Sequence, residues 1–122
     1  MPNPEAQKPK QFDLEDRTLK FAKRVNEYVK ALPKSIPNIE NGKQLVRSAG
    51  SVGANYIEAN ESLSKKDFVM RCKISRKEAK ESRFWLNLSE PLPNWTSEQS
   101  ALIQESTELG RIFGSIITKF RI

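Results

Sequence analysis

Polar side chains recur at helical spacing in the middle of the chain, and they are the first candidates for chemistry. They are Arg47, Ser51, Asn55 and Glu58, joined by Glu78 and Glu81 from a later segment. Residues three or four apart share one face of an α-helix, so the first four form a polar stripe. A buried carboxylate in such a stripe needs a partner, and an arginine can bind it through two hydrogen bonds.

Two interpretations of these six residues stay open. In the first, Glu58 and Glu81 hold a metal ion, or act as a general acid and base. In the second, the stripe is a structural hydrogen-bond network that fixes how neighbouring helices align. The chain has no histidine, which removes the commonest metal ligand and the commonest general base. We therefore favour the structural network, and expect no catalytic residue, no metal ion and no cofactor.

A row of cations forms the second candidate site. Its members are Lys66, Lys73, Arg76, Lys77, Lys80 and Arg83. From Lys65 to Arg83 there are eight basic and three acidic residues, an excess of five positive charges in a chain of net charge +6. Such a face matches a phosphate backbone, whose binding releases counterions. No sequence-reading motif is present, so we expect binding of RNA or DNA by shape and charge. The alternative is an ordinary solvated helix face.

Helices must position both sets of side chains. Apolar periodicity predicts helices over residues 14–32, 43–60, 65–89 and from Thr96 or Ser97 to the C-terminus. Asp13 and Ser64 are expected to cap two of them, and Pro37 with Asn41-Gly42 to mark a loop. Residues 1–11 are expected to be a flexible tail. Residues 12–122 are expected to form one all-α domain, an antiparallel up-down-up-down four-helix bundle.

The second predicted helix carries two glycines, Gly50 and Gly53. Each costs roughly 1 kcal/mol against alanine in a helix interior, so we expect close packing against a neighbouring helix to compensate. The alternative is a phosphate-binding loop over residues 50–53. That motif needs an upstream glycine and a Ser or Thr after its lysine, and Gly42-Lys43 lacks both.

The sequence also predicts which side chains are exposed to solvent and which are buried. Arg17 and Arg24 on the first helix are expected to face water. Apolar side chains beyond the main stripes either form a subunit interface or complete the core of a single chain. They are Trp85, Trp95, Ile103 and Ile112.

Bulk composition narrows the class of protein. The one cysteine, Cys72, excludes an internal disulfide and fits a reducing compartment, and we expect it to be an inert thiol on an apolar face. No apolar run is long enough to span a bilayer, and no signal-peptide pattern opens the chain. We therefore expect a cytoplasmic protein that does not bind membranes.

With these residues in view, the chain resembles a family of small four-helix-bundle proteins, the 23S rRNA intervening-sequence (S23-like) proteins. The resemblance covers about residues 12–122. The matching segments are FAKRVNEYVKALP, QLVRSAGSVGANYIEA, DFVMRCKISRKEAKESRFWLNL and ESTELGRIFGSII. Two mild departures are Ser75, where alanine is common in the family, and Ser89, where leucine is common.

The resemblance implies a bundle that assembles into a ring, typically a homopentamer. It also implies kinship with the accessory proteins of diversity-generating retroelements, which are basic pentamers that bind a reverse transcriptase and nucleic acid. No enzymatic activity is attached to the family. A ring would repeat the cationic row around its circumference, and several weak contacts would add up to strong binding.

Two hypotheses about function follow. In the first, the chain is a non-enzymatic, oligomeric accessory protein that binds RNA or DNA by charge and assists a larger enzyme such as a reverse transcriptase. In the second, it is a protein–protein interaction scaffold with no role in nucleic-acid binding.

Overall fold

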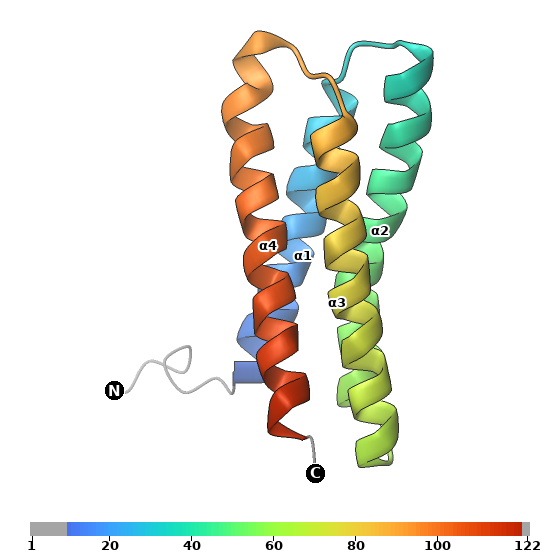
Figure 1. The fold of residues 1–122 in the computed structure, drawn as a ribbon, viewed down its shortest axis with the longest axis vertical. Coiled ribbons are helices and arrows are strands. Elements are labelled where there is room, and N and C mark those ends of the chain that lie inside the picture. Colours follow the sequence, from blue (N-terminus) through green and yellow to red (C-terminus); the bar gives the residue numbers. More distant parts are fainter. Residues whose placement is uncertain (1–9, 121–122) are drawn as a thin grey trace, which may run out of the picture.

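Four long helices make up almost all of the described chain. The structure is a computed structural model that describes residues 10–120, with side chains for residues 14–120. The helices are α1 (Lys10–Lys30), α2 (Ile36–Asn60), α3 (Lys65–Leu88) and α4 (Thr96–Lys119), and a short 3-10 helix, η2 (Pro93–Trp95), precedes α4. Residues 10–120 contain no strand. Successive helices alternate in direction (Figure 1), which confirms the predicted antiparallel four-helix bundle.

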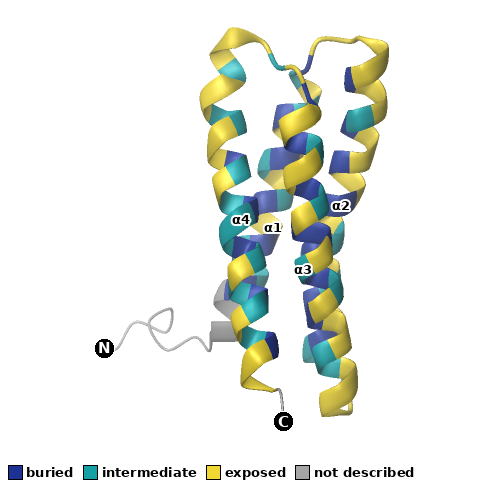
Figure 2. Cartoon of the chain, in the orientation of Figure 1, coloured by how far each residue is buried: buried dark blue, intermediate teal, exposed yellow. Residues whose placement is uncertain are grey.

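The apolar stripes of the four helices meet in one core. α1 and α3 each pack against both α2 and α4, so the helices surround a common axis. Figure 2 shows buried segments recurring along every helix. The four side chains predicted either to form a subunit interface or to complete the core of one chain are partly buried and pack against this core. They are Trp85, Trp95, Ile103 and Ile112.

α2 begins earlier than the sequence predicted, at Ile36 and not at Lys43. Pro37 lies in the first turn, where a missing N–H costs no helical hydrogen bond. The Ser35 side chain caps this turn by accepting a hydrogen bond of 3.1 Å from the Asn38 backbone N–H. The predicted loop at Asn41-Gly42 is therefore wrong. Gly42 is buried, and a Cβ there would lie 3.1 Å from Cγ1 of Val29 on α1.

The other helix boundaries differ less. α1 begins at Lys10, so Asp13 lies inside the helix, and its side chain is outside the described ones. Ser64 caps α3 by accepting a hydrogen bond of 3.1 Å from the Asp67 backbone N–H, as predicted. α4 has Trp95 at its N-cap, so neither Thr96 nor Ser97 takes that position. Residues 1–9 of the predicted tail lie outside the described residues.

The two glycines of α2 lie in regular helix, which makes the alternative of a phosphate-binding loop wrong. A Cβ at Gly53 would lie 2.8 Å from the side-chain oxygen of Thr18 on α1. Gly53 therefore permits the close approach that the sequence predicted. Gly50 does not, because a Cβ at that position would meet no heavy atom within 4 Å.

Two arginines of α1 bind carboxylates of α4 and do not simply face water, contrary to expectation. Arg17 donates two hydrogen bonds of 2.8 Å to Glu105, and Arg24 donates hydrogen bonds of 3.0 and 2.9 Å to Glu98. These bonds raise the pKa of both guanidinium groups. Helical periodicity placed both arginines on the polar side of α1, but it could not show that α4 brings carboxylates there.

Candidate nucleic-acid interface

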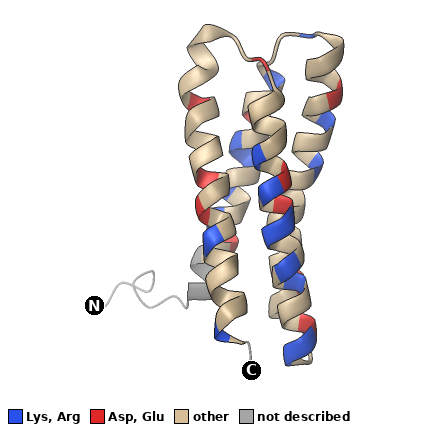
Figure 3. Cartoon of the chain, viewed as in Figure 1, with Lys and Arg blue, Asp and Glu red and all other residues tan. Residues whose placement is uncertain are grey.

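The cationic row lies on the side of α3 that faces away from the core. Small and apolar side chains fix the opposite side of the helix in the bundle. They are Cys72, Ser75, Ala79, Ser82 and Leu86. Figure 3 shows basic segments following one another along α3. From Lys66 to Arg83 the row extends over about 26 Å, at 1.5 Å per helical residue.

Most of the cationic row is exposed to solvent and forms no ion pair among the described residues. Of its six members, Arg76 alone is half-buried, and its side chain leans towards Gly114 of α4. Across residues 14–120, none of the six forms an ion pair with a carboxylate. Arg17, Arg24 and Arg47, by contrast, all pair with glutamates. The positive field of α3 is therefore left open to an external anion.

Two shallow hollows accompany this row. One, of about 400 Å³, is lined by Lys73, Arg76, Lys77, Lys80, Glu81 and Phe84. The other, of about 530 Å³, is lined by Lys65, Lys66, Val69, Met70, Lys73 and Phe120. In both hollows ammonium groups lie beside apolar side chains. This combination suits a ligand that carries phosphates and flat apolar groups together.

The polar stripe of α2 meets α3 in fewer places than the sequence suggested. Arg47 donates a hydrogen bond of 3.1 Å to Glu81, and its other terminal nitrogen lies 3.7 Å from Oε2 of Glu78. Arg47 therefore bridges the two carboxylates of α3. Glu81 is 40% exposed at its side chain, whereas Glu78 is buried.

The other members of the stripe have different partners. Asn55 accepts a hydrogen bond of 3.1 Å from Arg71 and donates one of 2.9 Å to the Ser51 carbonyl. Ser51 thus contributes its backbone, and no side-chain hydrogen bond of Ser51 occurs among the described residues. Glu58 is exposed and forms no ion pair in that part of the chain. The structure brings together Arg47, Glu78 and Glu81 but does not add Glu58 to them.

Antiparallel register explains this division. Each step forward along α2 meets a residue further back along α3. Ser48 bonds Ser82 at 2.9 Å, the Val52 carbonyl accepts a bond of 2.8 Å from Ser75, and Asn55 meets Arg71. Glu58 follows in the same direction and shares a surface hollow with residues at the start of α3, Asp67 and Met70. Helical periodicity gives the face of each stripe but not the register between two stripes.

Three serines of the α2–α3 contact were missing from the predicted network. Ser48 and Ser82 are fully buried and bond each other, and Ser75 bonds the α2 backbone. The available signal was small polar residues at core positions of both helices. Such residues let two helices approach closely while each hydroxyl keeps a partner.

Glu78 is the electrostatically unusual member of the contact. One of its oxygens, Oε2, is buried without a hydrogen-bond partner among the described residues. Desolvation by burial raises the pKa of Glu78, and the charge of Glu81 raises it further, while the charges of Arg47 and, to a smaller extent, Lys77 oppose both effects. Arg47 is thus the main group that favours the charged form of this carboxyl.

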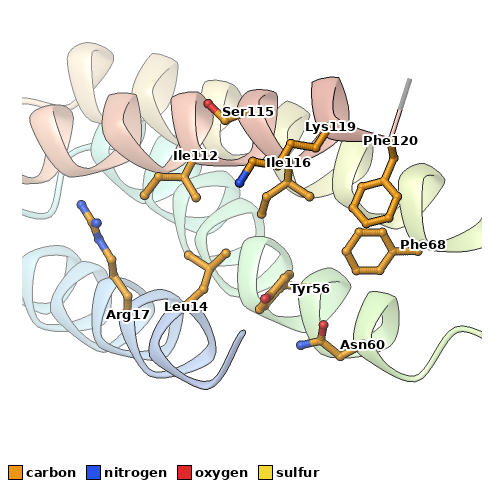
Figure 4. Close-up of a pocket in the computed structure, with 10 residues that line it drawn as sticks. All are labelled: Leu14, Arg17, Tyr56, Asn60, Phe68, Ile112, Ser115, Ile116, Lys119 and Phe120. Atoms are coloured by element: carbon orange, nitrogen blue, oxygen red, sulfur yellow. The ribbon is translucent and has the colours of Figure 1, made fainter. Parts of the chain in front are cut away.

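Neither a cluster of metal ligands nor an exposed cysteine occurs among the described residues. No group of three or more Cys, Asp or Glu side chains among them could hold a metal ion. Cys72 is buried, and burial raises the pKa of its thiol to about 11, which disfavours the nucleophilic thiolate. A pocket of about 540 Å³ lies near the end of the bundle where α1 begins and α4 ends, and its lining residues are drawn in Figure 4. Its walls are mostly apolar, and no carboxylate lines it.

No helix in the described range combines the length and apolarity needed to cross a bilayer. The fold and the α2–α3 contact define a small four-helix-bundle protein with one basic surface helix. The family model described as "23S rRNA-intervening sequence protein" matches residues 10–115. The chain belongs to this family.

A solved structure supports the same assignment. It is the crystal structure of a protein of unknown function from the S23 ribosomal protein family of Bacteroides thetaiotaomicron. It is 30% identical to this chain, superposes with a TM-score of 0.75, and the match covers 90% of this chain and 99% of that one. No curated protein matches the sequence. The family assignment is thus consistent with the fold, and the solved relative is described as a protein of unknown function.

Proposed function

We propose that this protein is a non-enzymatic accessory protein that assembles from several copies and binds RNA or DNA through the cationic row of α3. The family name refers to an intervening sequence in 23S rRNA, which is compatible with RNA as a ligand. The resemblance to retroelement accessory proteins makes a reverse transcriptase the kind of enzyme that this protein would assist in the cytoplasm.

The observation that carries this proposal is the contrast between two classes of cation. Three arginines between helices form ion pairs with glutamates, whereas the six cations of the row on α3 form none within residues 14–120. Like charges along one helix repel each other, and a polyanionic ligand would relieve this repulsion. Their clustering therefore favours such a ligand. Each contact with a phosphate would release a counterion and contribute to affinity without reading sequence.

Self-association would use an exposed apolar face of α2. Ile39, Val46 and Ile57 are 44%, 40% and 51% exposed and recur at helical spacing. Gly50 lies between them, and open space surrounds the place of its missing Cβ. A second copy could therefore approach the α2 backbone closely at that point. Five copies joined head to tail would close into a ring and repeat the cationic row around it.

The assembly can be tested by sedimentation of the full chain. Changing Val46→Glu and Ile57→Glu together should convert an assembly of several chains into a single chain, because charge would be buried in each contact. Leu63→Glu is the matched control, since Leu63 is fully exposed outside the helices and should not matter. A single-chain mass for the unmodified protein, or an unchanged mass for the double variant, would refute this surface.

Nucleic-acid binding can be tested by charge reversal. We expect Lys73→Glu, Lys77→Glu and Lys80→Glu together to abolish binding of labelled RNA and DNA. The control reverses Lys20, Lys23 and Lys34, which are exposed cations outside α3, and has the same net charge. It should retain most of the affinity. Equal losses in both variants would mean that net charge and not the α3 face governs binding.

The scaffold hypothesis predicts a different result. A protein partner would stay bound after nuclease treatment and in high salt, and the freshly purified protein would show no ultraviolet absorbance from nucleic acid. That outcome, together with unchanged behaviour of the α3 variant, would favour a scaffold without a nucleic-acid role.

A further inference from the structure

We infer that the hollow at Phe84 is a base-stacking subsite, so that the ligand of α3 is a single strand and not a duplex. The inference rests on the proposed function and adds to it the form of the nucleic acid. Phe84 is 58% exposed, and the residue lies within α3 and not in a loop or at the helix end. It lines the same hollow as Lys73, Lys77 and Lys80.

The cations and the aromatic ring share one helix face. Phe84 follows Lys80 by four residues and Lys77 by seven, so the three side chains lie in line on α3. Lys73 extends this line, and about 17 Å of helix separate it from Phe84 at 1.5 Å per residue. A strand whose phosphates follow the lysines would therefore reach the phenyl ring at the end of the row.

The ring is held in place by its neighbour. Phe84 and Trp85 contact each other at a centroid distance of 4.9 Å with an interplanar angle of 80°. Trp85 itself packs against the core, so its ring restricts the movement of Phe84. An edge-to-face contact uses one part of the Phe84 ring, and more than half of the side chain remains exposed for a second aromatic group.

An exposed ring beside lysines distinguishes single strands from duplexes. In a duplex each base is stacked inside the helix, and a phenyl group on a surface hollow meets only sugars and phosphates. In a single strand an unpaired base can lie on the ring, which typically strengthens binding about fivefold or more per stacked base. Cations alone would favour a duplex, because its charge density is higher. The ring therefore supplies the preference for single strands.

The experiment measures fluorescence anisotropy of three labelled probes with the full chain at one salt concentration. The probes are a short oligothymidylate, an abasic strand with the same number of phosphates, and a duplex of equal length. Phe84→Ala should weaken oligothymidylate binding about five- to tenfold and change binding of the abasic strand less than about twofold. Phe84→Trp should restore the affinity. Leu19→Ala, an exposed apolar residue of α1, is the matched control and should change nothing.

Two outcomes overturn the inference while leaving the proposed function intact. In one, Phe84→Ala leaves oligothymidylate binding unchanged or weakens the abasic strand equally. In the other, the unmodified protein binds the duplex more tightly than the single strand. Absence of binding to all three probes would instead contradict the proposed function. Circular dichroism of each variant verifies that the bundle is folded.

Discussion

The burial and the charged neighbours of Glu78 determine its pKa and its effect on the stability of the protein. Its carboxylate is buried, close to the like charge of Glu81, and faces a single arginine at 3.7 Å. The resulting upward shift in the pKa of Glu78 means that the folded chain holds a proton more tightly than the unfolded chain. Stability from this group is therefore greatest at low pH and falls as pH rises above the ordinary value of 4.5.

We expect Glu78→Gln to stabilise the protein at neutral pH. The amide keeps the shape of the side chain but has no charge to desolvate, and Arg47 retains Glu81 as a partner. The melting temperature of the variant should exceed that of the unmodified protein at pH 7.5, and the difference should shrink as pH approaches 4.5. A variant that is less stable at pH 7.5 would show that the attraction of Arg47 outweighs the cost of burial.

Two glycines should respond to alanine with opposite signs. Gly53→Ala would place a Cβ 2.8 Å from Thr18 Oγ1 and force α1 away from α2, so we expect a loss of about 1–2 kcal/mol in the free energy of unfolding. Gly110→Ala in α4 meets nothing within 4 Å and should add about 0.8–1 kcal/mol through helix propensity. Urea unfolding of both variants and of the unmodified protein measures these changes in the free energy of unfolding. A stabilising Gly53→Ala would disprove the close contact.

At the scale of elements, α1 depends on polar contacts with α4 more than the sequence suggested. Arg17 and Arg24 each bind a glutamate of α4 in two places. Periodicity predicted where α1 is polar. It could not predict these pairs, because the partners lie more than 70 positions away in the sequence.

The ion pair of Arg24 and Glu98 should contribute modestly to the free energy of unfolding. Both side chains are about one-third exposed, so solvent screens the pair, and we expect a coupling of about 0.5–1 kcal/mol. The measurement is a double-mutant cycle of urea unfolding with Arg24→Gln and Glu98→Gln. Coupling should fall at high salt. A coupling of zero at low salt would mean that packing alone holds α1 against α4.

Helix order and direction could be predicted, but one helix start could not. The apolar stripes and the prolines sufficed for four antiparallel helices. Pro37 and Gly42 both suggest a loop when each is taken alone. In the folded chain Ser35 caps α2 and Pro37 lies in its first turn. Gly42 leaves room for the side chain of Val29 on α1. A tertiary contact thus reversed the local preference of Gly42.

At the scale of the whole molecule, two groups of cations lie in different surroundings. Glutamates pair with the arginines that join helices, while the cationic row on the outer side of α3 forms no ion pair within residues 14–120. The sequence already predicted this row, because the basic residues cluster in one helix. The polar network was predicted only in part. Arg47, Glu78 and Glu81 meet, whereas Glu58 lies too far along antiparallel helices to join them.

The salt dependence of nucleic-acid affinity tests the role of the cationic row most directly. For the full chain, the logarithm of the binding constant should fall linearly and steeply with the logarithm of salt concentration. Changing Lys73, Lys77 and Lys80 together to Gln should make that slope shallower by about two to three, since each lost phosphate contact removes about 0.7–0.9. The same slope in both proteins, or no binding at all, would contradict a nucleic-acid interface on α3.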